Sequence, residues 1–301
     1  MFKINDKIQK AETNMKKQML IGVISLGMAL FVASPVAHAA SSPNLAAANN
    51  FTILSGSYSN TVSGTTINGD LGYTTPPATA PTVNGSTHVA DATYNQAGID
   101  QGAALSQLNS QPCSYTFPPG NIDLASDTTH GVVGAYNPGV YCISGAASIG
   151  GGGTITLTGT GTYIFRMTGA LTTSANSIVT LAGGASPCNV WWTPGAATTL
   201  GANSTFSGTD IDASGITIGN LVVWAGRALS FGGTVSTTND TISSTACSSA
   251  VTSSATAATK TPGLPNTGGS ALPMNHTLPM SLLAGAFVAT PMLAYAVRKR
   301  F

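Results

Sequence analysis

The chain has 301 residues, of which only 7% are charged and 43% are hydrophobic, and it contains 35 glycines. So few charges exclude both a long disordered polyelectrolyte and an ordinary soluble helical bundle. The formal net charge of +1 hides an uneven distribution, because eight of the eleven basic residues lie outside residues 40–267. Between those ends three basic residues face eight aspartates, so nucleic acid is not an expected partner.

Residues 1–39 have the pattern of a secretory signal peptide. The basic pair Lys16-Lys17 precedes a mostly apolar stretch, Met19–Val36, and Ala37-His38-Ala39 forms a small-x-small cleavage site. The segment before Met15 is long for an n-region, so Met15 is an alternative start. A membrane anchor is the alternative interpretation, but the cleavage site directly after the apolar stretch favours secretion.

Residues 87–108 have the periodicity of an amphipathic helix. Residues at helical spacing form its buried side: Ala90, Tyr94, Ala97, Gln101, Ala104 and Leu108. We expect Asp91 and Asp100 to face water. A single helix of this kind needs a surface to cover, and the most apolar strands, with Tyr163, Phe165 and Trp191-Trp192, would supply it.

From Val140 onward, short apolar-centred segments alternate with Gly, Asn and Ser. Taken three per coil, they repeat at about 18 residues in the last coils, as Leu200, Ile218 and Val235 illustrate. Strands this short do not suit ordinary hairpins. The pattern predicts an all-β fold with one long helix, a β-solenoid of triangular section, over residues 40–247. A sandwich of short strands is the structural alternative.

Four cysteines lie in this predicted exported domain, which fits an oxidising compartment. Four cysteines allow three pairings, and we favour Cys113–Cys142 and Cys188–Cys247. The first would close a loop rich in Pro and Gly, and the second would hold the last strand. Neither His88 nor His130 has metal-ligand spacing to a cysteine, so we expect no metal and no cofactor.

Several segments resemble the ice-binding domain of the DUF3494 family, and they occur in the family's order across residues 49–247. They are Phe51–Gly56, Ile67–Gly72, Val83–Ala92, Pro138–Tyr141, Gly161–Met167, Cys188–Trp192 and Gly226–Leu229. The resemblance implies a discontinuous right-handed β-solenoid of three faces with one helix alongside. It also implies a monomeric, non-enzymatic protein whose partner is an ice crystal surface. Residues 109–137 look longer than the family needs and suggest a cap.

Strands in a solenoid stack about 4.8 Å apart, near an oxygen repeat of the ice lattice. If the apolar residues of the second strand series point inward, four threonines point outward in one file: Thr172, Thr199, Thr217 and Thr234. The third series gives a secondary file: Thr156, Ser177, Thr205, Val222 and Thr241. Threonine is also a good exposed strand residue for β-propensity alone. The family resemblance favours an ice-binding face, with the first file as the primary candidate.

Two other functions remain open. A polysaccharide lyase or hydrolase would need a cleft that joins Asp210 and Asp212, which alternate on one strand, with Arg227 one coil later. Local hydrogen bonding is the structural alternative for these acids. A non-ice adhesin would need exposed aromatic rings for sugar stacking, and Trp224 is the ring to inspect. No G-x-S-x-G, P-loop or H-E-x-x-H motif is present, so we expect no enzyme.

The C-terminus combines a stalk with a sorting signal. Residues 248–263 are rich in Ser, Thr, Ala and Pro and predict a flexible stalk. Residues 264–301 resemble an LPxTG sortase signal: Leu264, Pro265, Asn266, Thr267 and Gly268 precede an apolar run, Leu278–Val297, and Arg298-Lys299-Arg300. The resemblance implies cleavage after Thr267, attachment to peptidoglycan and only transient membrane contact. The long gap and three prolines in the tail depart from the pattern, and a plain membrane anchor is the alternative. Both interpretations place the domain outside the cell.

Overall fold

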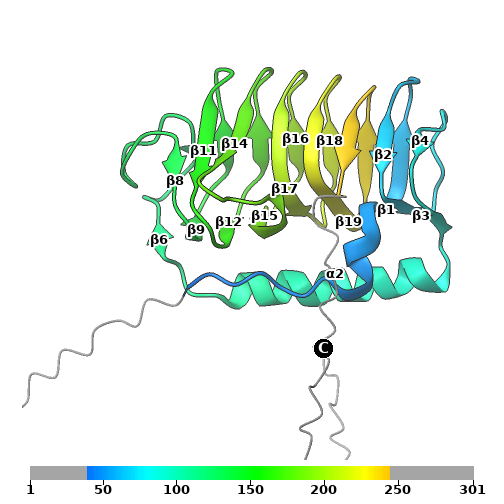
Figure 1. Ribbon diagram of the computed structural model, residues 1–301, viewed down its shortest axis with the longest axis horizontal. Helices are drawn as coiled ribbons and strands as arrows, with labels where there is room; N and C mark the ends of the chain where they lie inside the picture. The colour runs from blue at the N-terminus through cyan, green and yellow to red at the C-terminus, as the bar shows by residue number, and fades with distance from the viewer. Residues whose placement is uncertain (1–38, 245–301) are drawn as a thin grey trace, which may run out of the picture. The chain divides into compact units, whose positions relative to one another are not determined.

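A computed structural model describes residues 39–244 of the chain. These residues form twenty short strands, one α-helix, α2 (Ala92–Ser110), and two 3₁₀ turns, η1 (Ala46–Asn50) and η2 (Pro187–Asn189). All the strand pairings are parallel, and they form three ladders that make the sides of a coil stack (Figure 1). The predicted β-solenoid with one helix is confirmed, and the sandwich alternative is wrong.

One ladder, the helix face, lies next to α2. Its own strands are β3 (Asp70–Tyr73), β5 (Thr87–Val89), β6 (Tyr115–Thr116), β9 (Gly139–Ile143), β12 (Tyr163–Met167) and β15 (Val190–Thr193). Three longer strands turn corners: β1 (Phe51–Asn60) and β17 (Thr205–Ile211) serve two faces each, and β19 (Val223–Thr237) serves all three. These long strands tie neighbouring faces together through continuous backbone.

The second face and the third face consist of the remaining strands. The second face contains β7 (Ile122–Asp123), β10 (Ala147–Ile149), β13 (Leu171–Thr173), β16 (Thr198–Leu200), β18 (Ile216–Ile218) and the last residues of β19 and β1. The third face contains β2 (Thr66–Asn68), β4 (Thr82–Val83), β8 (Ala135–Tyr136), β11 (Thr154–Thr158), β14 (Ile178–Ala182), β20 (Thr241–Ser243) and the first residues of β17 and β19.

The stack is discontinuous along the chain. Strand β1, the first in the sequence, pairs with β19, the last but one, so that Ile53 lies opposite Ala228 and Leu54 opposite Leu229. The N-terminal coils therefore complete the end of the stack that the C-terminal coils reach. Helix α2 then runs back along the helix face to the other end, where β6 begins the next coil (Figure 1). This arrangement agrees with the discontinuous solenoid that the family resemblance implied.

Alternation along each strand produces two cores. Inward side chains fill the coil interior, where Phe165 stacks on Trp192 with ring centroids 4.4 Å apart and on Tyr141 at 5.1 Å. Outward side chains of the helix face, such as Ile164 and Trp191, form a second cluster with α2. Burial of this apolar area is the main stabilising contribution to the fold, since each coil is too small to fold alone.

Helix α2 buries the side that its periodicity predicts. Tyr94, Ala97, Gln101, Ala104 and Leu108 are buried, as expected. The predicted start is wrong, because residues 87–89 form β5 and the side chain of Asp91 caps the helix by accepting a hydrogen bond from the Tyr94 N–H. Ala90, placed on the buried side by the prediction, is exposed in the turn.

The cap expected at residues 109–137 is a terminal coil that begins after α2 ends at Ser110. Strands β6, β7 and β8 pair with β9, β10 and β11 and bury Phe117, Leu124 and Tyr136 against the end of the core. The predicted disulfide Cys113–Cys142 is confirmed and joins this coil to β9. Cys188 is disulfide-bonded, but its predicted partner Cys247 lies outside the described residues.

Within residues 39–244, no helix combines the length and apolarity that a membrane span requires. The predicted signal peptide, the stalk, the Leu264–Gly268 motif and the apolar run all lie outside the described residues. Both core clusters lie within residues 39–244, and they belong to one compact unit, Met1–Ala250.

Candidate functional site

The second face carries a straight file of small hydroxyl side chains. Backbone register aligns Ser148 with Thr172, Thr172 with Thr199, and Thr199 with Thr217. The three threonines are exposed, whereas their strand neighbours such as Leu171, Leu200 and Ile218 are buried. Three of the four predicted primary residues therefore lie in one file.

The fourth predicted residue, Thr234, is not in that file. Thr217 lies opposite Ser236, and Ser236 lies opposite Ser59 of β1. Thr234 is exposed on the same face but precedes Ser236 on its strand and lies opposite Ser57. The spacing assumed from Thr217 was too short for this coil, because β19 contains extra residues where it turns the corner at 231–233.

The corrected file is Ser148, Thr172, Thr199, Thr217, Ser236 and Ser59, and we call it the hydroxyl file. The residues two positions earlier in the sequence are small as well: Ala146, Ala170, Ala197, Gly215, Thr234 and Ser57. The single charged side chain in register with this file is Asp123, at the end next to Ser148. The second face therefore carries small side chains and few charges along its length.

The predicted secondary file needs more correction. Thr205 and Thr241 are exposed and share a file on the third face, with Val223 between them. Ser177 is buried, because it lies before β14 and its hydroxyl donates to the Ile149 carbonyl.

Two further assignments in that file are shifted by register. Thr156 lies opposite Thr180 and is not in the file of Thr205. Thr154, two residues earlier on β11, is in that file, because it pairs with Ile178, which pairs with Thr205. Val222 is buried and Val223 is exposed, because Val223 and not Val222 is paired with Thr205. A shift of one residue reverses which side chains face solvent.

The exposed side chains of the third face differ more in size than those of the second face. It exposes the branched side chains of Ile178 and Val223, at 39% and 54%, in the same file as Thr205. Bulky side chains raise this surface above the level of the neighbouring threonines. The second face is therefore the better candidate for contact with a flat, ordered surface.

The acids considered for catalysis do not form an open site. Asp210 and Asp212 are fully buried, and their alternation places both on the inner side of the wall. Arg227 lies in register with Thr209, on the opposite side, and its guanidinium donates to the carbonyl oxygen of Asn49 in η1. The wall separates the arginine from the acids, so this constellation is not a lyase site. Asp212 makes the expected local hydrogen bond by accepting from the Ser214 N–H, whereas neither carboxylate oxygen of Asp210 has a partner within hydrogen-bonding geometry.

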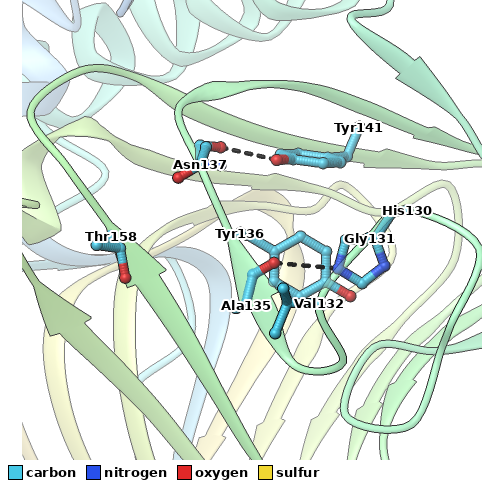
Figure 2. Close-up of a pocket in the computed structure, with 8 residues that line it drawn as sticks. All are labelled: His130, Gly131, Val132, Ala135, Tyr136, Asn137, Tyr141 and Thr158. Atoms are coloured by element: carbon cyan, nitrogen blue, oxygen red, sulfur yellow. Dashed lines mark hydrogen bonds between the residues drawn. The ribbon is translucent and has the colours of Figure 1, made fainter.

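A pocket of about 480 Å³ lies at the terminal coil, lined partly by Tyr136, Tyr141 and His130 (Figure 2). The rings of Tyr136 and Tyr141 are almost fully buried, and the Tyr141 hydroxyl donates to the Asn137 carbonyl. Trp224 is buried too, with its indole N–H bonded to the Gly208 carbonyl. These rings offer no open platform for sugar stacking, which removes the observation that would favour a glycan-binding adhesin.

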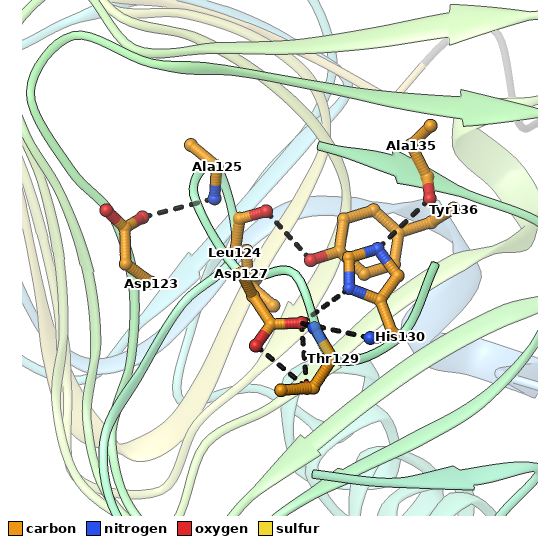
Figure 3. Close-up of polar contacts among 8 residues, drawn as sticks. All are labelled: Asp123, Leu124, Ala125, Asp127, Thr129, His130, Ala135 and Tyr136. Carbon is orange, nitrogen blue, oxygen red and sulfur yellow. Dashed lines mark hydrogen bonds and ion pairs between the residues drawn. The ribbon is translucent and has the colours of Figure 1, made fainter. Parts of the chain in front are cut away.

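His130 and Asp127 resemble a catalytic dyad but are engaged on every side (Figure 3). The His130 Nδ1 lies 2.6 Å from an Asp127 carboxylate oxygen, and its Nε2 lies 3.1 Å from the Ala135 carbonyl oxygen. The imidazole also stacks on Tyr136, with centroids 4.1 Å apart. Neither ring nitrogen is available to a substrate, so the pair fixes the loop of the terminal coil. No cluster of three or more potential metal-ligating acids, histidines or cysteines occurs among residues 39–244.

Comparison with known proteins points to one family. A family model described as Ice-binding-like matches residues 53–243. An ice-binding protein of Nostoc sp. (strain HG1) is 32% identical over 212 residues, which cover 66% of this chain and 73% of that protein. An ice-binding protein of Flavobacterium frigoris (strain PS1) is 28% identical over 198 residues, covering 62% and 71%. The crystal structure of an ice-binding protein from an Antarctic biological consortium has a TM-score of 0.61 and 26% identity, covering 70% of this chain and 95% of that one.

Proposed function

This chain belongs to the Ice-binding-like family, and we propose that it is an ice-binding protein that adsorbs through its second face. The observation that carries the proposal is the hydroxyl file, in which side chains repeat at the strand spacing of about 4.8 Å on a face poor in charge. The function is binding, not catalysis.

Such a face suits ice for physical reasons. A threonine presents one hydroxyl, which can hydrogen-bond to water, and one methyl group, which limits the number of water arrangements around it. Repeated at a fixed spacing on rigid backbone, these groups can hold water in an ice-like layer that merges with the crystal. Charged side chains would bind water in competing orientations, and between Ser148 and Ser59 the file has none.

Two equal substitutions distinguish the faces. Thr199→Tyr places a ring in the middle of the hydroxyl file, while Thr205→Tyr places the same ring on the third face. Both positions are exposed, so neither change disturbs the core. We expect Thr199→Tyr to lose most of the thermal hysteresis and crystal shaping of the parent chain and Thr205→Tyr to keep them. The opposite result would move the binding site to the third face.

We further propose that the domain is displayed on the cell wall. The predicted signal peptide at residues 1–39, the LPxTG-like motif at residues 264–268 and the apolar and basic tail support this localisation. The disulfide Cys113–Cys142 is consistent with an oxidising compartment. Wall attachment would let the protein hold a cell to ice or limit ice growth at its surface.

The anchor is tested by fractionating cells that express the full chain. In the LPxTG pattern the third position is variable and the threonine forms the new bond. We therefore expect Thr267→Val to move the protein from the muramidase-released wall fraction to the membrane fraction, and Asn266→Ala to leave it in the wall. A wall fraction that loses no protein in Thr267→Val would refute sortase attachment.

A further inference from the structure

Inside the coil stack, four polar side chains bury oxygen atoms that have no hydrogen-bond partner. They are Thr198, Asp210, Asp212 and Ser230, and each residue is 0% exposed. The unpartnered atoms are both carboxylate oxygens of Asp210, Oδ2 of Asp212 and the two hydroxyl oxygens. An unpaired buried polar group costs free energy, so several together need an explanation.

Register brings these side chains to one corner, where the helix face turns into the second face. Asp210 lies between Trp192 and Ala228, whose side chains belong to the interior cluster. Asp212 follows two residues later and therefore points to the same side. Its N–H donates to the Leu229 carbonyl, which places Ser230 beside it in the next coil.

Thr198 approaches the pair from the preceding coil. Its N–H donates to the carbonyl of Gly215, three residues after Asp212. It is aligned with Leu171 and Ile216, which both point into the interior. Its hydroxyl lies close enough to influence both carboxyls but outside hydrogen-bonding geometry.

Two adjacent carboxylates inside a dry interior must be neutralised by protons or by a cation. Beyond the influence of the Thr198 hydroxyl on both carboxyls, no donor lies within hydrogen-bonding geometry of these five oxygens. A cation shared between the neighbouring coils would neutralise the two carboxylates and satisfy these oxygens together.

We propose that Thr198, Asp210, Asp212 and Ser230 form an internal site for one divalent cation, Ca²⁺ in preference to Mg²⁺. Two carboxylates balance the charge of the ion. Calcium accepts about six to eight oxygen ligands in flexible geometry, so five side-chain oxygens completed by backbone carbonyl groups suit it. Magnesium requires a near-ideal octahedron and keeps its waters, which this closed corner does not accommodate.

This proposal departs from the expectation of no metal, which rested on histidine and cysteine spacing. Because the ligands come from three successive coils, the cation would hold those coils in register beneath the hydroxyl file. Because all four residues are fully buried, the ion enters during folding and does not exchange readily afterwards. The ion would therefore stabilise the fold more than it would change the exposed hydroxyl file.

The test is refolding of the purified full-length chain. The chain is unfolded in guanidinium with EDTA, then refolded with CaCl₂, with MgCl₂ or with EDTA, and desalted. We expect about one bound Ca²⁺ per chain by elemental analysis, and an unfolding temperature about 5–10 °C above that of the EDTA sample. Equal retention of Mg²⁺ would overturn the preference for calcium. Absence of bound metal, with the same unfolding temperature in all three samples, would overturn the site.

Two variants locate the ion. Asp210→Asn keeps the shape of the side chain but removes a charged ligand, so we expect bound Ca²⁺ and the response to EDTA to be lost. Asp240→Asn is the matched control, since Asp240 is equally buried but its two oxygens accept N–H bonds from Val222 and Thr238. It should retain the ion. Loss of Ca²⁺ in Asp240→Asn but not in Asp210→Asn would contradict the assignment, and the wild-type measurement stands even if a variant does not fold.

Discussion

Among single residues, the contacts of each carboxyl group decide how its charge affects folding. The pKa of Asp91 is lowered, mainly because the Tyr94 N–H donates to it at the start of α2. Desolvation acts to raise the pKa of Asp127, but hydrogen bonds from His130 and Thr129 outweigh it and hold the pKa below its ordinary value. Asp240 is the opposite case, since burial raises its pKa to about 6 despite two N–H donors.

The raised pKa of Asp240 predicts a pH-dependent stability. The folded state binds a proton more tightly than the unfolded state, so this contribution is present below about pH 4 and is lost as the pH rises to about 6. We expect urea unfolding of wild type to lose up to about 3 kcal/mol more than Asp240→Asn across that interval. The difference between the two chains isolates Asp240 from the other acids. Parallel pH profiles would contradict the assigned pKa.

The residue scale is also where the sequence was least informative. Alternation predicted that Thr172, Thr199 and Thr217 share a file, because β16 and β18 follow the regular repeat of the coils. It failed at Thr234, where extra residues at a corner change the register, and at Ser177, which lies just before its strand. Corner lengths depend on tertiary packing, such as that of Phe231 against Tyr94, and leave no periodic signal.

Among the elements, α2 shows how closely the helix approaches the sheet. A Cβ added to Gly98 would lie 2.4 Å from ring atoms of Phe231, which is too close for normal packing. The backbone N–H of Phe231 also donates to the Gln101 side chain one turn later. Glycine thus sets the helix-to-sheet distance at this point, although it weakens the helix itself.

Two glycine substitutions separate these effects. Gly98→Ala improves helix propensity but forces the helix away from Phe231, so we expect a net loss of about 1–3 kcal/mol. Gly102→Ala, one turn later and exposed with no atom within 4 Å of its added Cβ, should instead stabilise by up to about 1 kcal/mol. Chemical denaturation measures both. A stabilising Gly98→Ala would show that the packing is looser than described.

The helix was predictable as an element because its period is long and uninterrupted. The buried residues from Tyr94 to Leu108 follow from spacing alone. The start of the helix was not predictable, because Thr87–Val89 pair with β3 as an edge strand. Pairing with residues far away overrides local periodicity. The capping side chain of Asp91 was the available signal for the true boundary.

For the whole molecule, the discontinuous path closes both ends of the stack. Strands β4 and β5 end one side, and β6, β7 and β8 end the other, each only two or three residues long. Such short edges limit pairing with another chain, which supports the expected monomer. The solenoid was predictable from the repeated strands. The pairing of β1 with β19 came only from the family resemblance, because no local pattern joins residues that far apart.

Adsorption of the second face to ice can be measured directly. The domain from residue 40 to residue 250, fluorescently labelled, is added to a single ice crystal held in a flow cell below the melting point, and the solution is then replaced by buffer. We expect wild type and Thr205→Tyr to remain on the crystal and Thr199→Tyr to wash away. A folded wild-type domain that leaves the ice with the solution would contradict it.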